Sequence, residues 1–107
     1  MTVTVIDASL NGGTINSVRV EFDARKRDKT LAERGLDFAR AGEVFAGHHF
    51  TAPDLRVDYG EDRYITVGTL DGRMVVMVWT LRGEACRVIS MRKANEREQT
   101  HYAQRME

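Results

Sequence analysis

The stretch "RMVVMVWTLRGEACRVISMR", residues 73–92, contains two strand-like runs joined by a tight turn. We predict strands over residues 73–82 and 85–92, with Gly83 marking the turn between them. A turn this short joins neighbouring strands as an antiparallel pair. The first strand is apolar without a break from Met74 to Trp79, which predicts a central strand covered on both faces.

A third strand, "RYITVG", is predicted directly upstream over residues 63–68. The turn signal Asp71-Gly72 links it to the next strand, so the three segments predict an antiparallel meander. Nearer the start of the chain, "TVTVID" and "TINSVRVEFD" alternate on either side of the turn signal "NGG" at 11–13. These segments predict either an N-terminal hairpin or one strand preceded by a loose extension.

Two helices are predicted between these strands. Asp23 is a good N-cap for the segment 24–34, and Gly35 is a good stop. Asp37 caps a second helix, in which Phe38, Ala41, Val44 and Phe45 have helical spacing and are predicted to be buried. Gly47 ends it, and a long polar loop with a short extended piece follows over residues 48–62.

The last helix begins after Asn95, which with Glu98 three residues later forms a capping-box signal. It is predicted to run through Tyr102 towards Met106. Helices before and after a strand meander predict an α+β fold: an antiparallel sheet packed with two N-terminal helices and one C-terminal helix.

Length and charge limit the classes of protein that fit. A chain of 107 residues with 16 Lys/Arg and 16 Asp/Glu predicts one neutral domain, without the broad positive field of a nucleic-acid binder. Residues 1–62 hold 8 basic and 11 acidic side chains, and residues 63–107 hold 8 and 5. The C-terminal half can therefore attract a phosphate backbone locally.

Compartment follows from two further features. The single cysteine, Cys86, excludes an internal disulfide and is interpreted as a small buried hydrophobe. The start of the chain lacks a signal-peptide pattern, and no apolar run approaches the ~20 residues of a membrane span. We therefore expect a cytoplasmic protein with no membrane partner.

Most catalytic motifs are missing from the sequence. His48 and His49 are adjacent in the loop and His101 is distant, so no histidine or cysteine pair has metal-ligand spacing. Ser90 has no nucleophile-elbow pattern around it, although its hydroxyl can donate to a neighbour or to a phosphate. No phosphate-binding glycine loop is present. Neither a metal nor another cofactor is predicted.

Cations at the strand ends are the remaining candidates. A period of two places Cys86, Val88, Ser90 and Arg92 on one face of the last strand. The same period places Val76, Val78, Thr80 and Arg82 on one face of the middle strand. The pairing predicts Arg82 near residues 85–87, and Arg92 with Lys93 near the start of the middle strand. Surface ion pairs are the alternative interpretation of these arginines.

Three segments together resemble the BrnT family of toxins from bacterial type II toxin–antitoxin systems. They are "FDARKRDKTLAERGLDFARAGEVF", "GEDRYITVG" and "VVMVWTLRGEACRVISMRKANEREQTHY". The most specific pieces are Gly60-Glu61-x-Arg63 and the segment 87–94 with the following Glu98 and Tyr102. Phe22 stands where the family usually has tryptophan, and Thr30 and Arg34 stand where asparagine and histidine are common.

The resemblance implies one RelE-like domain over residues 1–107, with a family-like core at 19–107 and an extension or extra hairpin at 1–18. It implies a ribonuclease that slows growth. It also implies a cognate ribbon-helix-helix antitoxin, a heterotetrameric complex, and contact with DNA only through that antitoxin.

Metal-free RNA cleavage needs an activated 2′-hydroxyl, a stabilised phosphate and a protonated leaving group. With the resemblance, we predict Arg63 and Arg92 as phosphate stabilisers and Glu61 as the base. His101 or Tyr102 is the predicted acid. The predicted RNA contacts are Arg25, Lys26, Arg82, Ser90 and Lys93.

Two alternatives remain. Glu61 and Arg63 can form a simple loop ion pair, and Tyr102 can pack the last helix onto the sheet. At the level of function, the alternative is a non-catalytic module of the same fold that only binds its partner in a regulatory complex.

Overall fold

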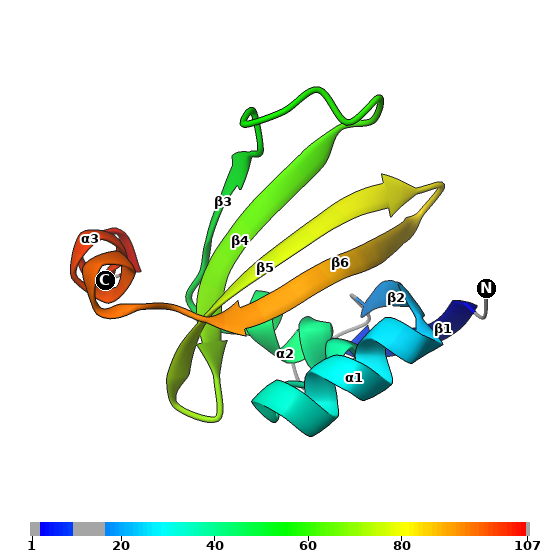
Figure 1. Ribbon diagram of the computed structural model, residues 1–107, viewed down its shortest axis with the longest axis horizontal. Coiled ribbons are helices and arrows are strands. Elements are labelled where there is room, and N and C mark those ends of the chain that lie inside the picture. Colours follow the sequence, from blue (N-terminus) through cyan, green and yellow to red (C-terminus); the bar gives the residue numbers. More distant parts are fainter. Residues whose placement is uncertain (1–2, 10–16, 107) are drawn as a thin grey trace.

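The computed structural model describes residues 3–9 and 17–106 (Figure 1). Within them, six strands form one sheet in the order β1-β2-β6-β5-β4-β3. The elements in chain order are β1 Val3–Ser9, β2 Ser17–Asp23, α1 Ala24–Arg34, η1 Phe38–Arg40, α2 Ala41–Ala46, β3 Phe50–Pro53, β4 Arg63–Leu70, β5 Arg73–Arg82, β6 Ala85–Lys93, α3 Glu96–Ala103 and η2 Gln104–Met106.

The predicted meander is confirmed. β4, β5 and β6 pair antiparallel, with Leu70 opposite Arg73 at one turn and Arg82 opposite Ala85 at the other. β3 adds antiparallel to β4 and is the extended piece of the loop. β5 therefore lies inside the sheet, as its unbroken apolar run predicted.

The N-terminal strands form a hairpin, since β1 pairs antiparallel with β2. The predicted turn "NGG" lies outside the described residues. One pairing differs from the predicted antiparallel sheet: β2 runs parallel to β6 between Arg19↔Ala85 and Phe22↔Val88, so the sheet is mixed. The two strands belong to one sheet but are separated by the helices and the meander, and such a pairing has no local turn signal in the sequence.

Both N-terminal helices begin and end where their caps predicted. The Asp23 carboxylate accepts the backbone N–H groups of Arg25 and Lys26, and Gly35 closes α1 in the left-handed region at φ 69°. Asp37 caps η1, which continues into α2. In the described residues, no helix is long and apolar enough to span a membrane.

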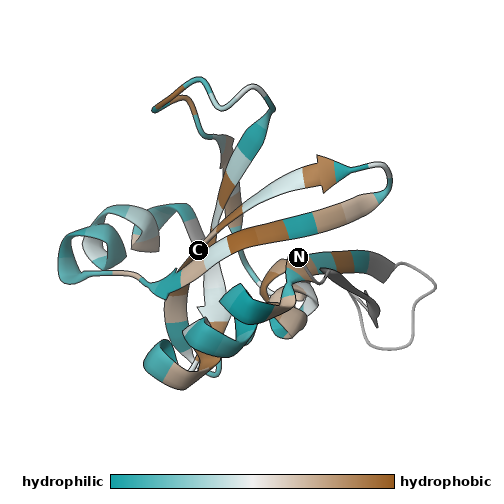
Figure 2. Ribbon diagram, turned by 45° about the vertical axis from the view of Figure 1, so that its right-hand side comes forward, coloured by the Kyte–Doolittle hydropathy of each residue, from teal (hydrophilic) through white to brown (hydrophobic). Residues whose placement is uncertain are grey.

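The main core lies on one side of the sheet, here called the core face, beneath η1 and α2. Figure 2 shows brown segments along the central strands, whereas α1 and α3 are mostly teal. Full burial of a large apolar side chain stabilises the fold by about 1.5–3 kcal/mol. The buried members of this core are Val20, Phe22, Leu36, Phe38, Ala41, Val44, Leu70, Val75, Met77, Cys86, Val88 and Met91.

The other side of the sheet, here called the open face, is covered only in part. Val67, Val76 and Ala94 form a small buried cluster there, and Tyr102 of α3 packs against it. The capping box predicted for α3 is present, with Asn95 and Glu98 each accepting the other's backbone N–H. α3 buries none of its own residues fully, so it lies on the edge of the open face.

The prediction of one shared face on the last strand is wrong for the set Cys86, Val88, Ser90 and Arg92. Trp79 pairs with Val88 and Val78 pairs with Ser90, which leaves Ile89 as an extra residue in a β-bulge. The bulge shifts the alternation by one position. Cys86 and Val88 therefore belong to the core, whereas Ser90 and Arg92 lie on the open face.

Cys86 is a structural residue, as its sequence context predicted. Its side chain is buried in the core, 3% exposed. Burial raises the pKa of the thiol to about 12, because desolvation disfavours the thiolate. The thiol is therefore not a nucleophile.

Candidate functional site

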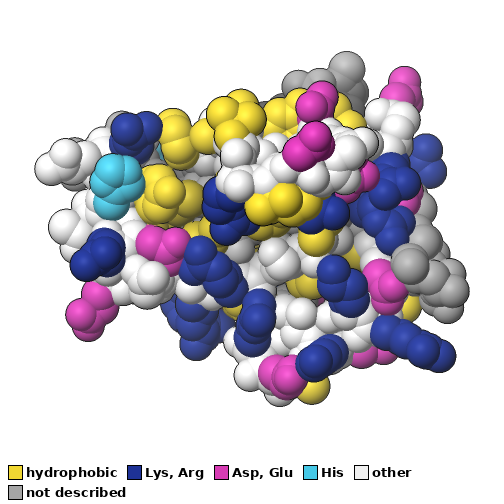
Figure 3. Space-filling view, turned by 45° about the horizontal axis from the view of Figure 1, so that its top comes forward, with side chains coloured by type: hydrophobic (Ala, Val, Ile, Leu, Met, Phe, Trp, Pro, Cys, Tyr) yellow, Lys and Arg dark blue, Asp and Glu magenta, His cyan; other side chains and the backbone are white. Residues whose placement is uncertain are grey.

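A cavity of about 320 Å³ lies on the open face between the sheet and α3, and we call it the α3 cavity. Its apolar floor is made of Ile65, Val76 and Val78. Its polar wall consists of Arg56, Ser90, Arg92, Glu98 and Tyr102. In Figure 3, Lys and Arg side chains in dark blue lie across the surface around a hollow on this side of the molecule.

Strand pairing positions two members of this wall. Arg92 lies opposite Val76, and Ser90 lies opposite Val78, so both side chains rise from β6 beside the apolar floor. Since the bulge at Ile89 determines this orientation, an uninterrupted alternation from Val88 would turn Arg92 into the core. The bulge thus places the side chains of Arg92 and Ser90 in the cavity wall.

Arg92 forms a two-pronged ion pair with Glu98. Its Nη1 and Nη2 donate to the two carboxylate oxygens at 2.7 and 2.8 Å. This hydrogen bonding lowers the pKa of Glu98 to about 2 and raises the pKa of Arg92. The Arg92 side chain is 43% exposed, so an anion from solvent can reach the guanidinium in place of the carboxylate.

Arg56 is a cavity residue that the sequence did not reveal. Its Nε and Nη2 donate to the Asp54 carboxylate, both at 2.8 Å. Asp54 is buried, and Arg56 is the main reason that its pKa falls to about 2. The charge of Arg56 also lowers the pKa of Arg92, against the stronger effect of Glu98. The two positive charges therefore repel each other across the cavity.

Tyr102 contributes a hydroxyl-bearing ring from α3. The ring packs beside Phe50, with centroids 6.1 Å apart, and also lines the α3 cavity. His101 packs edge-on against Tyr102 at 4.9 Å and is exposed. Of the two predicted acids, the structure places only Tyr102 in the cavity wall.

A second group of charges forms around Glu61 at the other end of the open face. Glu61 accepts hydrogen bonds from Arg63 at 3.0 Å and from Arg82 at 3.3 Å. The Arg63 guanidinium lies 4.1 Å from the ring centre of Tyr59. Arg63 also lies opposite Thr80, which lies opposite Arg87 in turn.

This second group faces a different hollow, which we call the loop cavity. It has a volume of about 460 Å³, and its charged lining is Asp54, Asp58, Glu61, Asp62 and Arg63. Of the predicted site residues, Arg63, Glu61 and Arg82 are thus brought together, but apart from Arg92, Ser90 and Tyr102. Tyr59 connects the two groups: its hydroxyl donates to Asp54 at 3.3 Å and its ring supports Arg63.

The other predicted RNA contacts lie outside both cavities. Lys93 follows Arg92 and lines a separate hollow with Gly72 and Met74. Lys26 lines a hollow between α1 and β6, and Arg25 is exposed on α1 outside the hollows described here.

Both family departures in the first helix lie in the hollow that Lys26 lines. Thr30 and Arg34 are part of its wall, and the Nη1 of Arg34 donates to the Met91 carbonyl at 2.9 Å. Arg34 thus ties α1 to the edge of β6 and does not enter the α3 cavity.

The histidines are not gathered for metal binding. His48 and His49 are exposed, and the His49 ring packs on Phe45. Across residues 3–9 and 17–106, no group of three or more His, Cys, Asp or Glu side chains could hold a metal ion. The chemistry that the α3 cavity can support is anion binding by two guanidinium groups beside two hydroxyls and one carboxylate.

Comparison with known families gives a match that covers most of the chain. Residues 22–98 match the family model described as "Ribonuclease toxin, BrnT, of type II toxin-antitoxin system". The matched range covers well over half of the chain and includes Arg56, Arg92 and Glu98, whereas Tyr102 lies beyond it. No curated protein matches the chain.

Proposed function

The chain belongs to the BrnT family of ribonuclease toxins of type II toxin–antitoxin systems, and from this premise we propose that its α3 cavity cleaves RNA without a metal ion. The observation that carries the proposal is the meeting of Arg92, Arg56, Ser90 and Tyr102 around one hollow. Guanidinium groups there can take the charge-stabilising role that a metal has in other nucleases.

The scissile phosphate would lie between Arg92 and Arg56. Arginine binds phosphate oxygens in the same two-pronged way in which Arg92 now holds Glu98. Phosphate oxygens would therefore replace the Glu98 carboxylate on Arg92. As negative charge grows on those oxygens in the transition state, both guanidinium groups bind more strongly.

The same exchange would prepare Glu98 as a base. While Arg92 holds it, Glu98 has a pKa of about 2 and is a poor proton acceptor. Once a phosphate binds to Arg92, Glu98 loses the hydrogen bonds from Arg92 that are the main cause of its low pKa. The pKa of Glu98 then rises. Glu98 then accepts the 2′-hydroxyl proton, and the 2′-oxygen attacks phosphorus.

The leaving 5′-oxygen needs a proton, and Tyr102 is the proposed donor because its ring lines the cavity wall. The products are a 2′,3′-cyclic phosphate and a free 5′-hydroxyl. In this scheme the cluster of Arg63, Glu61 and Arg82 binds a neighbouring part of the RNA, and Glu61 is the competing candidate for the base.

The partner is proposed to be the cognate antitoxin. Membership of a type II toxin–antitoxin family implies an antitoxin that binds the toxin. We propose that it carries a ribbon-helix-helix part, forms a heterotetramer with the toxin, and makes the only DNA contacts of the complex. Its release would let the toxin slow growth by cutting cytoplasmic RNA.

An RNA digest tests the activity. Antitoxin-free protein in the presence of a chelator is expected to cut single-stranded RNA and to leave 2′,3′-cyclic phosphate ends. Arg92→Ala and Arg56→Ala should each lower the rate about 10²–10³-fold, since each removes a charge-stabilising group. Arg73→Ala is the matched control, because Arg73 is an exposed arginine that lines neither cavity.

Two further variants separate the candidate bases. Glu98→Gln keeps the capping geometry but cannot accept a proton, so it should cut far more slowly than Glu61→Gln. The reverse ranking would assign the base to Glu61. RNA left intact by the parent protein, together with tight antitoxin binding, would establish the non-catalytic module instead.

A further inference from the structure

A third hollow, of about 280 Å³, lies between α1 and the edge of β6, and we call it the α1 groove. Ser90 lines both this groove and the α3 cavity, so the two hollows share that residue. We propose that the α1 groove binds the sugar–phosphate backbone of the RNA strand next to the bond that is cut. The inference rests on the proposed function, which places a phosphodiester in the α3 cavity.

The groove exists because α1 presents a polar stripe to β6. Lys26, Lys29, Thr30, Glu33 and Arg34 fall at helical spacing on one side of α1, and all of them line the groove. A helix that packs against a sheet normally presents apolar residues on that side. In α1 no residue is buried, so side-chain packing does not close the space.

The strand on the other side of the groove is also left uncovered. Pairing between β2 and β6 ends at Phe22↔Val88, and beyond it no strand in the described residues lies along this edge of β6. The bulge residue Ile89 and the next residue, Ser90, form this wall of the groove. Backbone edges and hydroxyls of this kind are common contacts for phosphate and sugar oxygens.

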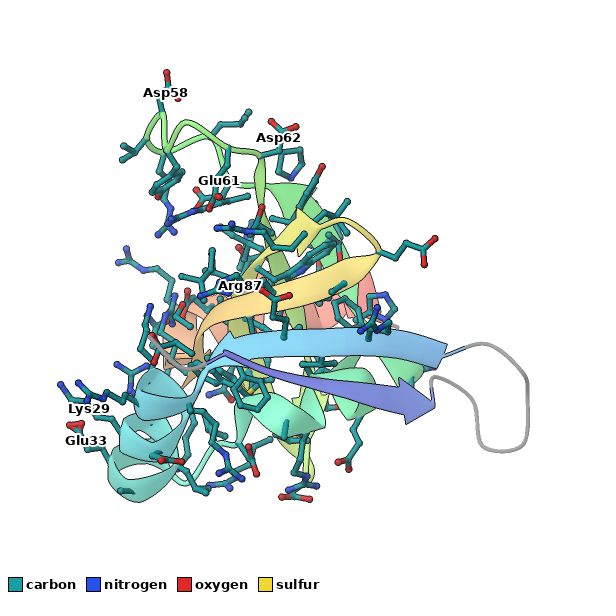
Figure 4. All side chains as sticks on the ribbon, turned by 90° about the vertical axis from the view of Figure 1, so that its right-hand side faces the viewer. Lys29, Glu33, Asp58, Glu61, Asp62 and Arg87 are labelled. Carbon is teal, nitrogen blue, oxygen red and sulfur yellow. The ribbon has the colours of Figure 1, made fainter. Side chains whose placement is uncertain are left out.

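Charge determines which way an RNA strand can leave the α3 cavity. The α1 groove has three cations, Lys26, Lys29 and Arg34, against the single carboxylate of Glu33. The loop cavity has four carboxylates against Arg63 alone. Figure 4 shows the two regions at opposite ends of the molecule, with Lys29 and Glu33 on α1 and Asp58, Glu61 and Asp62 on the loop.

A polyanion is attracted more strongly by the first region than by the second. Lys26 and Lys29 make no ion pair with another side chain in the described residues, so their charges are available to phosphates. The RNA strand is therefore expected to pass from the α3 cavity over Ser90 and along α1.

Oligonucleotide binding tests the groove directly. The probes are 2′-deoxy single strands, which cannot be cut, in a series from a dinucleotide upward. The affinity of the double variant Lys26→Ala/Lys29→Ala should fall increasingly below that of the parent protein as the oligonucleotide lengthens. The slope of log affinity against log salt should drop by about 0.7 for each lysine that loses a phosphate contact.

The matched control is Arg73→Ala, a cation at the β4–β5 turn that lines neither the α1 groove nor the α3 cavity. It should keep the parental slope. Thermal unfolding of each variant checks that α1 is intact. Because Lys26 and Lys29 are exposed, their substitution should change the unfolding temperature little.

The outcomes separate the groove from the proposed function. If the parent cuts RNA and the double variant keeps the parental slope at every length, the groove inference is wrong and the ribonuclease stands. If the two lysines matter only for binding the antitoxin, the groove is a protein-docking surface and the inference is again wrong. If the parent neither binds nor cuts RNA, both proposals fail.

Discussion

The buried polar side chains that the structure describes each have a hydrogen-bond partner. Thr66 accepts the Trp79 indole N–H at 2.8 Å and shares a hydrogen bond with Thr51, and Thr80 donates to the Asp62 carbonyl. In the described residues, no buried side-chain nitrogen or oxygen lacks a hydrogen-bond partner. Because an unpaired buried polar group costs about 1–3 kcal/mol, such pairing keeps the sheet stable beside a charged cavity.

Arginine–carboxylate pairs recur wherever the open face is charged. Arg92 is held by Glu98, Arg56 by Asp54, and Arg63 by Glu61. Each carboxylate holds its guanidinium in a defined position, and a phosphate can compete for the guanidinium where it is exposed. The open face thus carries guanidinium groups in defined positions although the whole chain is neutral.

The pair of Arg92 and Glu98 predicts a specific dependence of stability on pH. The folded-state pKa of Glu98 is about 2, below its ordinary value of 4.5. The stabilisation is therefore fully present above pH 4.5 and is lost as the pH falls towards 2. Glu98→Gln removes this contribution but keeps the capping box, so it should lower the free energy of unfolding at neutral pH by about 1 kcal/mol or less.

Urea unfolding from neutral pH to the acid range measures this effect. The difference in the free energy of unfolding between the parent and Glu98→Gln should become smaller below pH 4.5. Asp54 still makes the stability of both proteins sensitive to acid. Glu96→Gln, an exposed carboxyl in the same turn of α3, is the control. A gap of constant size at every pH would show that the ion pair contributes nothing.

At the scale of elements, close approach of α2 to β4 depends on one glycine. A Cβ at Gly68 would lie 2.6 Å from Val44 Cγ1 and 3.3 Å from the Val44 carbonyl oxygen. Val44 is fully buried and β-branched, so its side chain has little freedom to move aside. Gly68 therefore sets the distance between the helix and the sheet.

Gly68→Ala is expected to lower the free energy of unfolding by about 1–3 kcal/mol, the usual cost of overpacking a core. Chemical unfolding would measure the loss. Thr69→Ala is the control, since Thr69 is the next residue and is exposed. Equal stability of Gly68→Ala and the parent would mean that α2 can move away without cost.

The strand β6 and the helix α1 differ in how tightly they pack against the rest of the molecule. β6 is fixed on the core side by Val88 and Met91, yet its bulge turns Ser90 and Arg92 outward. α1 buries none of its residues fully and is tied to β6 through the hydrogen bond from Arg34 to the Met91 carbonyl. A strand fixed in the core beside a helix without buried residues leaves the space that the proposed RNA strand would occupy.

For the whole molecule, a single sheet that carries one main core predicts cooperative unfolding. Trp79 is the only tryptophan, and its ring stacks on Tyr64 at 4.8 Å and packs edge-on against Phe45. Its fluorescence therefore reports on the middle of the sheet and on α2 together. Far-UV circular dichroism reports on all strands and helices.

We expect both signals to follow one urea transition with the same midpoint, as in a two-state domain. Separate midpoints would mean that part of the molecule, such as α3, unfolds independently. Glu98→Gln weakens the contact between α3 and β6, so it is the variant in which such a separation should appear first.

Much of the fold follows from the sequence by itself. Caps at Asp23, Asp37 and Asn95, and stops at Gly35 and Gly47, predicted the helix limits, because capping depends on residues within one turn. The meander was predicted from two tight turns and one apolar strand, which are also features of neighbouring residues in the sequence. The family resemblance was confirmed over residues 22–98.

Only the tertiary structure decided how the charged residues group. A bulge at Ile89 depends on pairing between strands, so strict alternation assigned Arg92 to the same face as Val88. Arg56 comes from an irregular loop with no periodic signal, and Asp54 holds it at the α3 cavity. The sequence determined the elements through local interactions, whereas contacts between distant segments selected the arginines that face the α3 cavity.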